Sequence, residues 1–180
     1  QAYGADANFA FMENLQIFGY YAKTRTDELE GKDESYRARV AWRGEVWSTS
    51  VDHVLVGDNF NPEIGFLRRS DFRESNIFGR FSPSLASVSS IRRASLSGVV
   101  GYIENERLRF LESRNRAGRL EVEFENTDWL TVIFTDIYER LGEGTSISGA
   151  LIPAGRYSFR DVEVSYFFGP HRRVSGNLSL

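Results

Sequence analysis

Residues 36–43 read Tyr36-Arg37-Ala38-Arg39-Val40-Ala41-Trp42-Arg43, and this stretch decides the fold class. Successive side chains of a β-strand point to opposite sides, so every second residue shares a face. A strand would place Tyr36, Ala38, Val40 and Trp42 on an apolar face and the three arginines on the other. On a helix the same residues would scatter around the cylinder. The stretch therefore predicts a strand with one apolar and one cationic face.

The same period of two recurs along the chain. It is found in residues 93–102, 120–125, 130–138, 162–168 and 173–180. Residues typical of turns separate these runs at 27–33, 44–45, 104–106, 125–128, 142–155 and 169–171. We predict roughly nine or ten strands joined by hairpins, several of them twelve residues or longer against the usual length of about five or six. The fold class is therefore all-β and antiparallel.

Composition and motifs exclude several functions for this chain, which we predict to be a single domain over residues 1–180. It has no cysteine, so a disulfide scaffold and a thiolate metal site are excluded. Its net charge is −3, so no global basic field attracts nucleic acid, and we expect no nucleic-acid partner. His53 and His171 have no partner at metal-ligand spacing, and the common hydrolase and nucleotide-binding motifs are absent. We therefore expect no recognisable enzyme.

The chain has no run of apolar residues long enough for a transmembrane helix. It also has no signal peptide at its start, which favours a mature or excised segment. The last predicted strand still continues at Leu180. We therefore expect this sequence to be a segment of a longer protein.

Many long strands in series favour an up-and-down β-barrel or part of one, because closure removes the exposed edges of a sheet. The apolar face of such a barrel could point outward or inward, and each orientation implies a different kind of protein. In a membrane barrel the apolar face contacts lipid and the polar face lines the lumen. In a soluble barrel or sandwich the apolar face lies inside and binds a small apolar ligand or a glycan. The alternation alone does not distinguish the two.

Dense charge on the polar faces favours the membrane reading. The candidate lumen-lining residues are Arg37, Arg39, Arg43, Glu121, Glu123 and Glu125. Like charges on one face repel, and pairing of arginine with glutamate across strands would offset this repulsion. Aromatic residues such as Trp42, Trp47 and Phe168 also cluster near strand ends, as in the aromatic girdles of membrane barrels. The three glutamates also leave open a carboxylate-based hydrolase.

A second candidate site is the loop at residues 54–72. Its motif residues are Asp58, Asn59, Asn61, Glu63, Arg68, Arg69 and Asp71. The first four place oxygen ligands within six positions, which is compatible with calcium, although the spacing is not that of an EF-hand. The alternative is a turn stabilised by its Asp and Asn side chains. The arginines and Asp71 could hold a carboxylate or phosphate, or form an internal ion-pair network.

The run from Val56 to Arg73 (VGDNFNPEIGFLRRSDFR) resembles a bacterial family, domain-of-unknown-function family 5916. Segments at 6–9, 14–16, 102–105, 124–128 and 172–176 resemble the same family in the same order. The resemblance implies an envelope protein in which a carbohydrate-binding-module-like domain precedes an outer-membrane-like barrel, and this chain corresponds to part of the barrel. It further implies location in the bacterial outer membrane, with the bilayer as partner and carbohydrate reached through the leading domain.

Overall fold

The computed structural model describes residues 1–26, 31–62, 67, 69–147 and 149–180. The secondary-structure elements formed by these residues are all β-strands. No helix long and apolar enough to cross a membrane is found among the described residues. The twelve strands are β1 (Ala2–Phe11), β2 (Leu15–Thr24), β3 (Glu34–Arg43), β4 (Trp47–Val56), β5 (Phe72–Phe81), β6 (Ile91–Asn105), β7 (Leu111–Phe124), β8 (Trp129–Leu141), β9 (Thr145–Ile147), β10 (Ala150–Ile152), β11 (Gly155–Phe168) and β12 (Gly176–Ser179).

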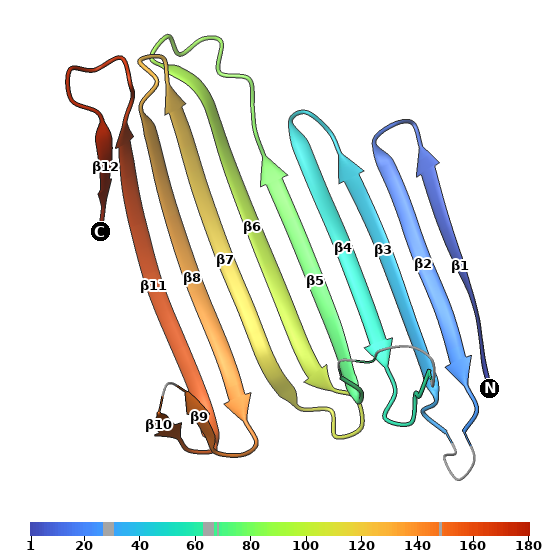
Figure 1. Cartoon of the computed structure of the whole chain (residues 1–180). Helices are drawn as coiled ribbons and strands as arrows, with labels where there is room; N and C mark the ends of the chain where they lie inside the picture. Colours follow the sequence, from blue (N-terminus) through green and yellow to red (C-terminus); the bar gives the residue numbers. More distant parts are fainter. Residues whose placement is uncertain (27–30, 63–66, 68, 148) are drawn as a thin grey trace.

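Ten strands form one antiparallel sheet in the order β1-β2-β3-β4-β5-β6-β7-β8-β11-β12. Each strand of this sheet pairs with the preceding strand in that order, so β11 pairs with β8. The strands β9 and β10, which lie between them in the chain, form a separate two-stranded hairpin. Figure 1 shows a single curved layer with the two termini at opposite edges. The sheet does not close, because β1 and β12 do not pair with each other. The predicted all-β, up-and-down fold is confirmed, in its partial-barrel form.

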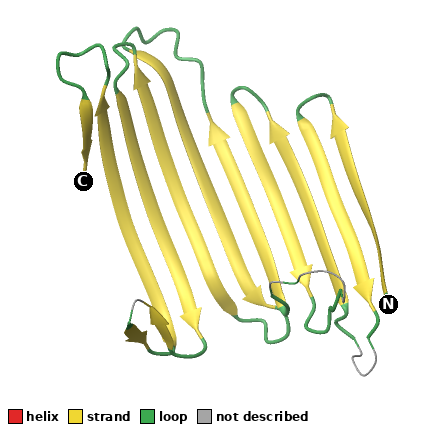
Figure 2. Ribbon diagram, in the orientation of Figure 1, coloured by secondary structure: helices red, strands yellow, loops and turns green. Residues whose placement is uncertain are grey.

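Strand lengths divide the sheet into two parts. The strands β1 to β5 each have 10 residues, whereas β6, β7, β8 and β11 have 13 to 15. Phe81, the last residue of β5, pairs with Leu96, so residues 91–95 of β6 extend beyond β5 at the upper end in Figure 2. The β9–β10 hairpin lies at the lower end. The predicted lengths of twelve or more residues are therefore confirmed for the second half of the sheet.

The structure changes three details of the predicted strand boundaries. Glu104 and Asn105 belong to β6, so the turn begins after them. The expected loop at 142–155 contains the β9–β10 hairpin. The last strand begins at Gly176 and not at Arg173, because the turn after β11 occupies the residues between them. In the first case the strand continues past the predicted turn, and in the third the alternation begins before the strand does, because side-chain period alone gives no strand boundary.

The sheet has almost no hydrophobic core. Among the described residues, Ala41 and Val56 are the buried hydrophobic ones, although 41% of the chain is hydrophobic. A single layer cannot bury either of its faces against another part of itself, so large apolar side chains stay on the surface. Leu96 is 57% exposed and Val162 is 59% exposed. An exposed apolar area of this extent is rare on a soluble monomer and marks a surface that contacts something else.

Candidate functional site

One face of the ten-stranded sheet is apolar. Residues directly opposite each other on paired strands share a face, so the register assigns every strand residue to one side. The apolar face carries a band, here called the apolar band, that crosses all ten strands. Its members include Phe9, Phe11, Ile17, Val40, Trp42, Trp47, Val51, Ile77, Phe81, Leu96, Val100, Leu120, Val122, Leu130, Val132, Phe134, Val162, Val164, Tyr166 and Leu178. None of these positions is charged.

The apolar band runs diagonally across the sheet. On β1 it extends from Tyr3 to Phe11, and on β11 it begins at Val162. The register places Phe11 and Val162 in the same row of paired residues, eight strand-to-strand steps apart. The lower limit of the band is Tyr3 on β1, eight residues below the row that contains its lower limit on β11, Val162. The limit therefore shifts by eight residues over eight strand-to-strand steps, or one residue per strand. With about 3.3 Å along and about 4.8 Å between strands, the strands are tilted by about 35° from the normal to the band.

The opposite face, here called the polar face, carries ion pairs. The Arg37 guanidinium donates two hydrogen bonds to Asp52 on β4, one of them 2.8 Å long from Nε to Oδ1. Arg39 lies 3.9 Å from the same carboxylate. Arg43 donates to the Gln16 side-chain oxygen on β2 at 3.2 Å. The three predicted arginines do share the polar face, but their partners come from β2 and β4.

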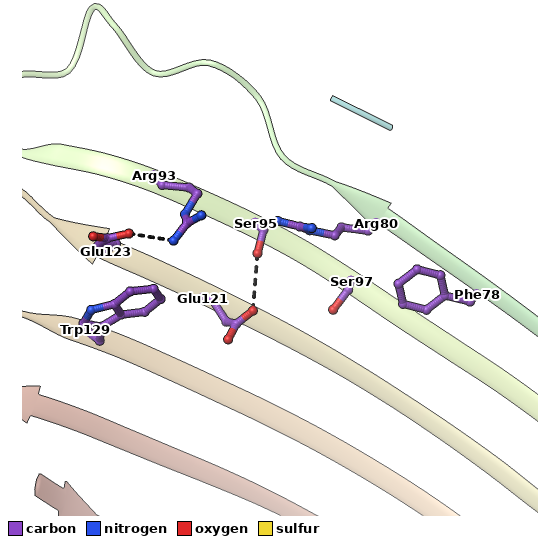
Figure 3. Close-up of a pocket in the computed structure, with 8 residues that line it drawn as sticks. All are labelled: Phe78, Arg80, Arg93, Ser95, Ser97, Glu121, Glu123 and Trp129. Carbon is purple, nitrogen blue, oxygen red and sulfur yellow. Dashed lines mark hydrogen bonds and ion pairs between the residues drawn. The ribbon is translucent and has the colours of Figure 1, made fainter. Parts of the chain in front are cut away.

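A hollow of about 360 Å³ lies on the polar face over β5 to β8. Figure 3 shows its lining residues, which are Phe78, Arg80, Arg93, Ser95, Ser97, Glu121, Glu123 and Trp129. Arg93 donates to Glu123 at 2.9 Å and also lies over the Trp129 ring, 5.6 Å from its centre. Acidic, basic, hydroxyl and aromatic groups therefore meet in one depression, which suits contact with polar or charged solutes.

The predicted glutamates fall into two groups. Glu121 and Glu123 lie on the polar face, where Glu123 is almost buried between Arg92 and Arg93 and Glu121 pairs with Arg119 at 3.0 Å. Glu125 lies in the turn after β7, so it does not continue this face. It contacts Arg92 at 3.6 Å in that turn. Three strands separate β3 from β7 in the sheet, so the predicted arginines and glutamates do not contact each other.

The loop before β5 packs on the turn between β6 and β7. Asp71 accepts a hydrogen bond from the Arg107 amide at 2.8 Å, and Arg69 pairs with Glu112. Arg73 pairs with Glu104 at 2.7 Å. Each of these contacts reaches β6, β7 or the turn between them. Arg69, Asp71 and Arg73 thus adopt the internal ion-pair network.

The candidate calcium ligands occupy the first half of the same loop. Asp58 lies 3.6 Å from Arg107, and the Asn59 side chain donates to the Gly31 carbonyl at 2.9 Å. The backbone N–H of Asn61 donates to Thr24 Oγ1 at 3.0 Å. Glu63 and Arg68 lie outside the described residues. Within the described ranges, no group of three His, Asp or Glu side chains is placed to hold a metal ion.

A buried carboxylate joins two turns at the upper end of the sheet. Asp128, in the turn before β8, is fully buried. It accepts hydrogen bonds from Arg172 Nε at 3.0 Å, from the Gly169 amide at 2.8 Å and from the Tyr166 hydroxyl at 2.7 Å. The Arg172 guanidinium, with these two further donors, holds the pKa of Asp128 well below its usual range. This cluster fixes the β11–β12 turn to the β7–β8 turn.

Sequence reasoning missed several residues of the polar face. Asp52, Arg80, Arg93 and Trp129 all lie there, and Asp52 holds both Arg37 and Arg39. A signal was present for Asp52, because it follows Ser48 and Ser50 at the strand period of two. For the others the partner depends on the register, which the alternation does not supply.

Comparison with known proteins gives no relative for this chain: no protein-family model, curated protein or solved structure matches it.

Proposed function

We propose that this chain is a wall segment of a membrane-embedded β-barrel of the bacterial outer-membrane type. In this proposal the apolar band contacts the lipid chains and the polar face lines the lumen. The barrel would serve transport, anchoring or assembly in the envelope. The observation that carries the proposal is the apolar band itself, which is exposed, uncharged and continuous across ten strands.

The tilt of the band supports this orientation. Strands of membrane barrels cross the bilayer in about 9–11 residues at about 35–45° from the barrel axis, with an apolar band about 25 Å tall. The strands β1 to β5 have 10 residues each. Ten residues at about 3.3 Å, tilted by about 35°, span roughly 27 Å. The length and the tilt, which come from independent observations, both agree with a bilayer-spanning wall.

The two sides of the band have the residues expected at membrane boundaries. Trp42 and Trp47 lie on the apolar face at one end of β3 and β4, where Trp47 stacks on Phe81 with ring centres 4.2 Å apart. Tyr21 and Tyr36 lie directly opposite each other near the other end. Tyr and Trp favour the bilayer interface because their rings are apolar and their tips are polar. The resemblance of residues 56–73 to family 5916 also favours an envelope barrel.

The tryptophans allow a direct test of which face contacts lipid. Trp47 lies on the apolar face and is 61% exposed, whereas Trp129 lies on the polar face beneath Arg93. Two variants would each keep one of them, with the other two tryptophans replaced by phenylalanine. In vesicles whose acyl chains carry bromine, we expect the fluorescence of Trp47 to be quenched and that of Trp129 to be unaffected. A water-soluble quencher, acrylamide, should act more strongly on Trp129.

A soluble barrel or sandwich predicts a different result. Its apolar face would lie inside, so brominated lipid would quench neither tryptophan. Strong quenching of Trp129 with protection of Trp47 would require the polar face to contact lipid. Either result would overturn the proposal.

A further inference from the structure

The apolar face changes character at its lower end, beyond the apolar band. The long strands β7, β8 and β11 continue there with charged side chains on the same face. Five arginines gather on this extension, and we call them the arginine patch: Arg114, Arg116, Arg140, Arg156 and Arg160. The patch lies on β7, β8 and β11, where the diagonal apolar band has already ended, whereas the residues paired with Arg116 and Arg114 on β6 are still Val100 and Tyr102.

Acidic side chains neutralise only part of the patch. Asp136, 6% exposed, lies between Arg114 at 2.9 Å and Arg160 at 3.0 Å, so two arginines share one carboxylate. Arg116 donates to the Tyr102 hydroxyl at 3.0 Å and not to an acid. Glu112, at the register shift near the start of β7, is engaged by Arg69. Among the described residues the patch therefore keeps an excess of positive charge.

Two arginines of the patch lie directly opposite each other on neighbouring strands. Arg140 of β8 pairs in register with Arg156 of β11. Like charges in this position destabilise a sheet. Arg140 lies over the Phe110 ring, 4.0 Å from its centre, and no ion pair of Arg156 is formed within the described part of the chain. The patch has donors and positive charge that an external anion would satisfy.

We propose that the arginine patch binds the phosphate groups of anionic lipids at the boundary of the bilayer. This inference rests on the proposed function, because a bilayer around the apolar band brings its headgroups to the level of the patch. Arginine suits this role, since its planar guanidinium donates two parallel hydrogen bonds to a phosphate. The attraction of each arginine to an anionic surface corresponds to roughly a fivefold gain in affinity.

Flotation of the full chain with lipid vesicles tests the proposal. Vesicles of phosphatidylcholine alone measure binding through the apolar band, and vesicles that also contain phosphatidylglycerol measure the preference for anionic lipid. We expect the unmodified chain to prefer the anionic vesicles at low salt. Replacement of Arg116, Arg156 and Arg160 by glutamine should reduce this preference at least tenfold, while binding to neutral vesicles stays unchanged. Arg156→Gln alone should reduce it about fivefold.

The matched control removes the same charge from the other face, by replacing Arg39, Arg43 and Arg119 with glutamine. This control should keep the preference, since those arginines lie on the polar face. Circular dichroism checks that each variant keeps its β-structure. If the patch variants keep the preference, or the control loses it equally, the inference is wrong. Failure of every variant and of the unmodified chain to bind neutral vesicles overturns the proposed function instead.

The source of the phosphate is distinguished by competition. Chloride and inorganic phosphate at equal ionic strength should weaken binding to anionic vesicles equally, because both act by screening. Stronger competition by inorganic phosphate would mean that the patch binds the free ion, and it would overturn the assignment to lipid headgroups.

Discussion

Asp128 and Arg172 lie 44 residues apart in the chain and are joined by two hydrogen bonds from one guanidinium to one carboxylate. The carboxylate is fully buried and receives further bonds from Gly169 and Tyr166. Asp128→Asn would leave the Arg172 charge without its partner and would remove acceptors from the other donors. We expect a lower midpoint of urea unfolding in detergent, measured by tryptophan fluorescence. Asp161→Asn, an exposed position on β11, serves as the control and should change the midpoint little.

The same carboxylate predicts an acid dependence of stability. Its pKa is lowered in the folded state, from an unfolded value of about 3.9. A group of this kind stabilises the fold fully above its unfolded pKa and loses that contribution as the pH falls through the folded pKa. The difference in stability between the unmodified chain and Asp128→Asn should therefore be constant from about pH 5 to 8. It should shrink below about pH 4. A difference that grows on acidification would contradict the assignment of Arg172 as the main partner.

The sequence was sufficient to predict the strands and their two faces, because the period of two is a local property of the backbone. The partners of charged side chains could not be predicted in the same way. Arg37 pairs with Asp52, 15 residues later, because a particular hairpin register places them side by side. Glu125 shows a second limit of the period. In the sequence it continues the alternation of β7, but the strand ends at Phe124. Contacts between turns, such as that of Asp128 with Arg172, leave no periodic signal.

The two arginines beside Asp52 should contribute unequally to stability. Arg37 makes a forked pair with Asp52, whereas Arg39 approaches the same carboxylate only to 3.9 Å. Both arginines are partly exposed, so solvent screens their pairs, and coupling energies of about 1 kcal/mol or less are expected. Double-mutant cycles with Arg37→Gln or Arg39→Gln against Asp52→Asn would measure the two couplings. We expect the Arg37 coupling to be the larger. Equal couplings would mean that the forked geometry adds nothing to the charge effect.

The apolar band makes a prediction that depends on depth. Val132 is the middle of three apolar residues on β8, between Leu130 and Phe134, whereas its neighbour Thr131 faces the polar side opposite Glu121. In a bilayer, Val132→Arg should destabilise the folded state by about 2–4 kcal/mol, the cost measured for arginine near the midplane of barrel proteins. Thr131→Arg introduces the same side chain one residue away and should cost less than about 1 kcal/mol, because it meets water and an acidic neighbour. Unfolding in phosphatidylcholine vesicles with added denaturant measures both. Equal destabilisation by the two substitutions would show that β8 does not separate lipid from a polar lumen.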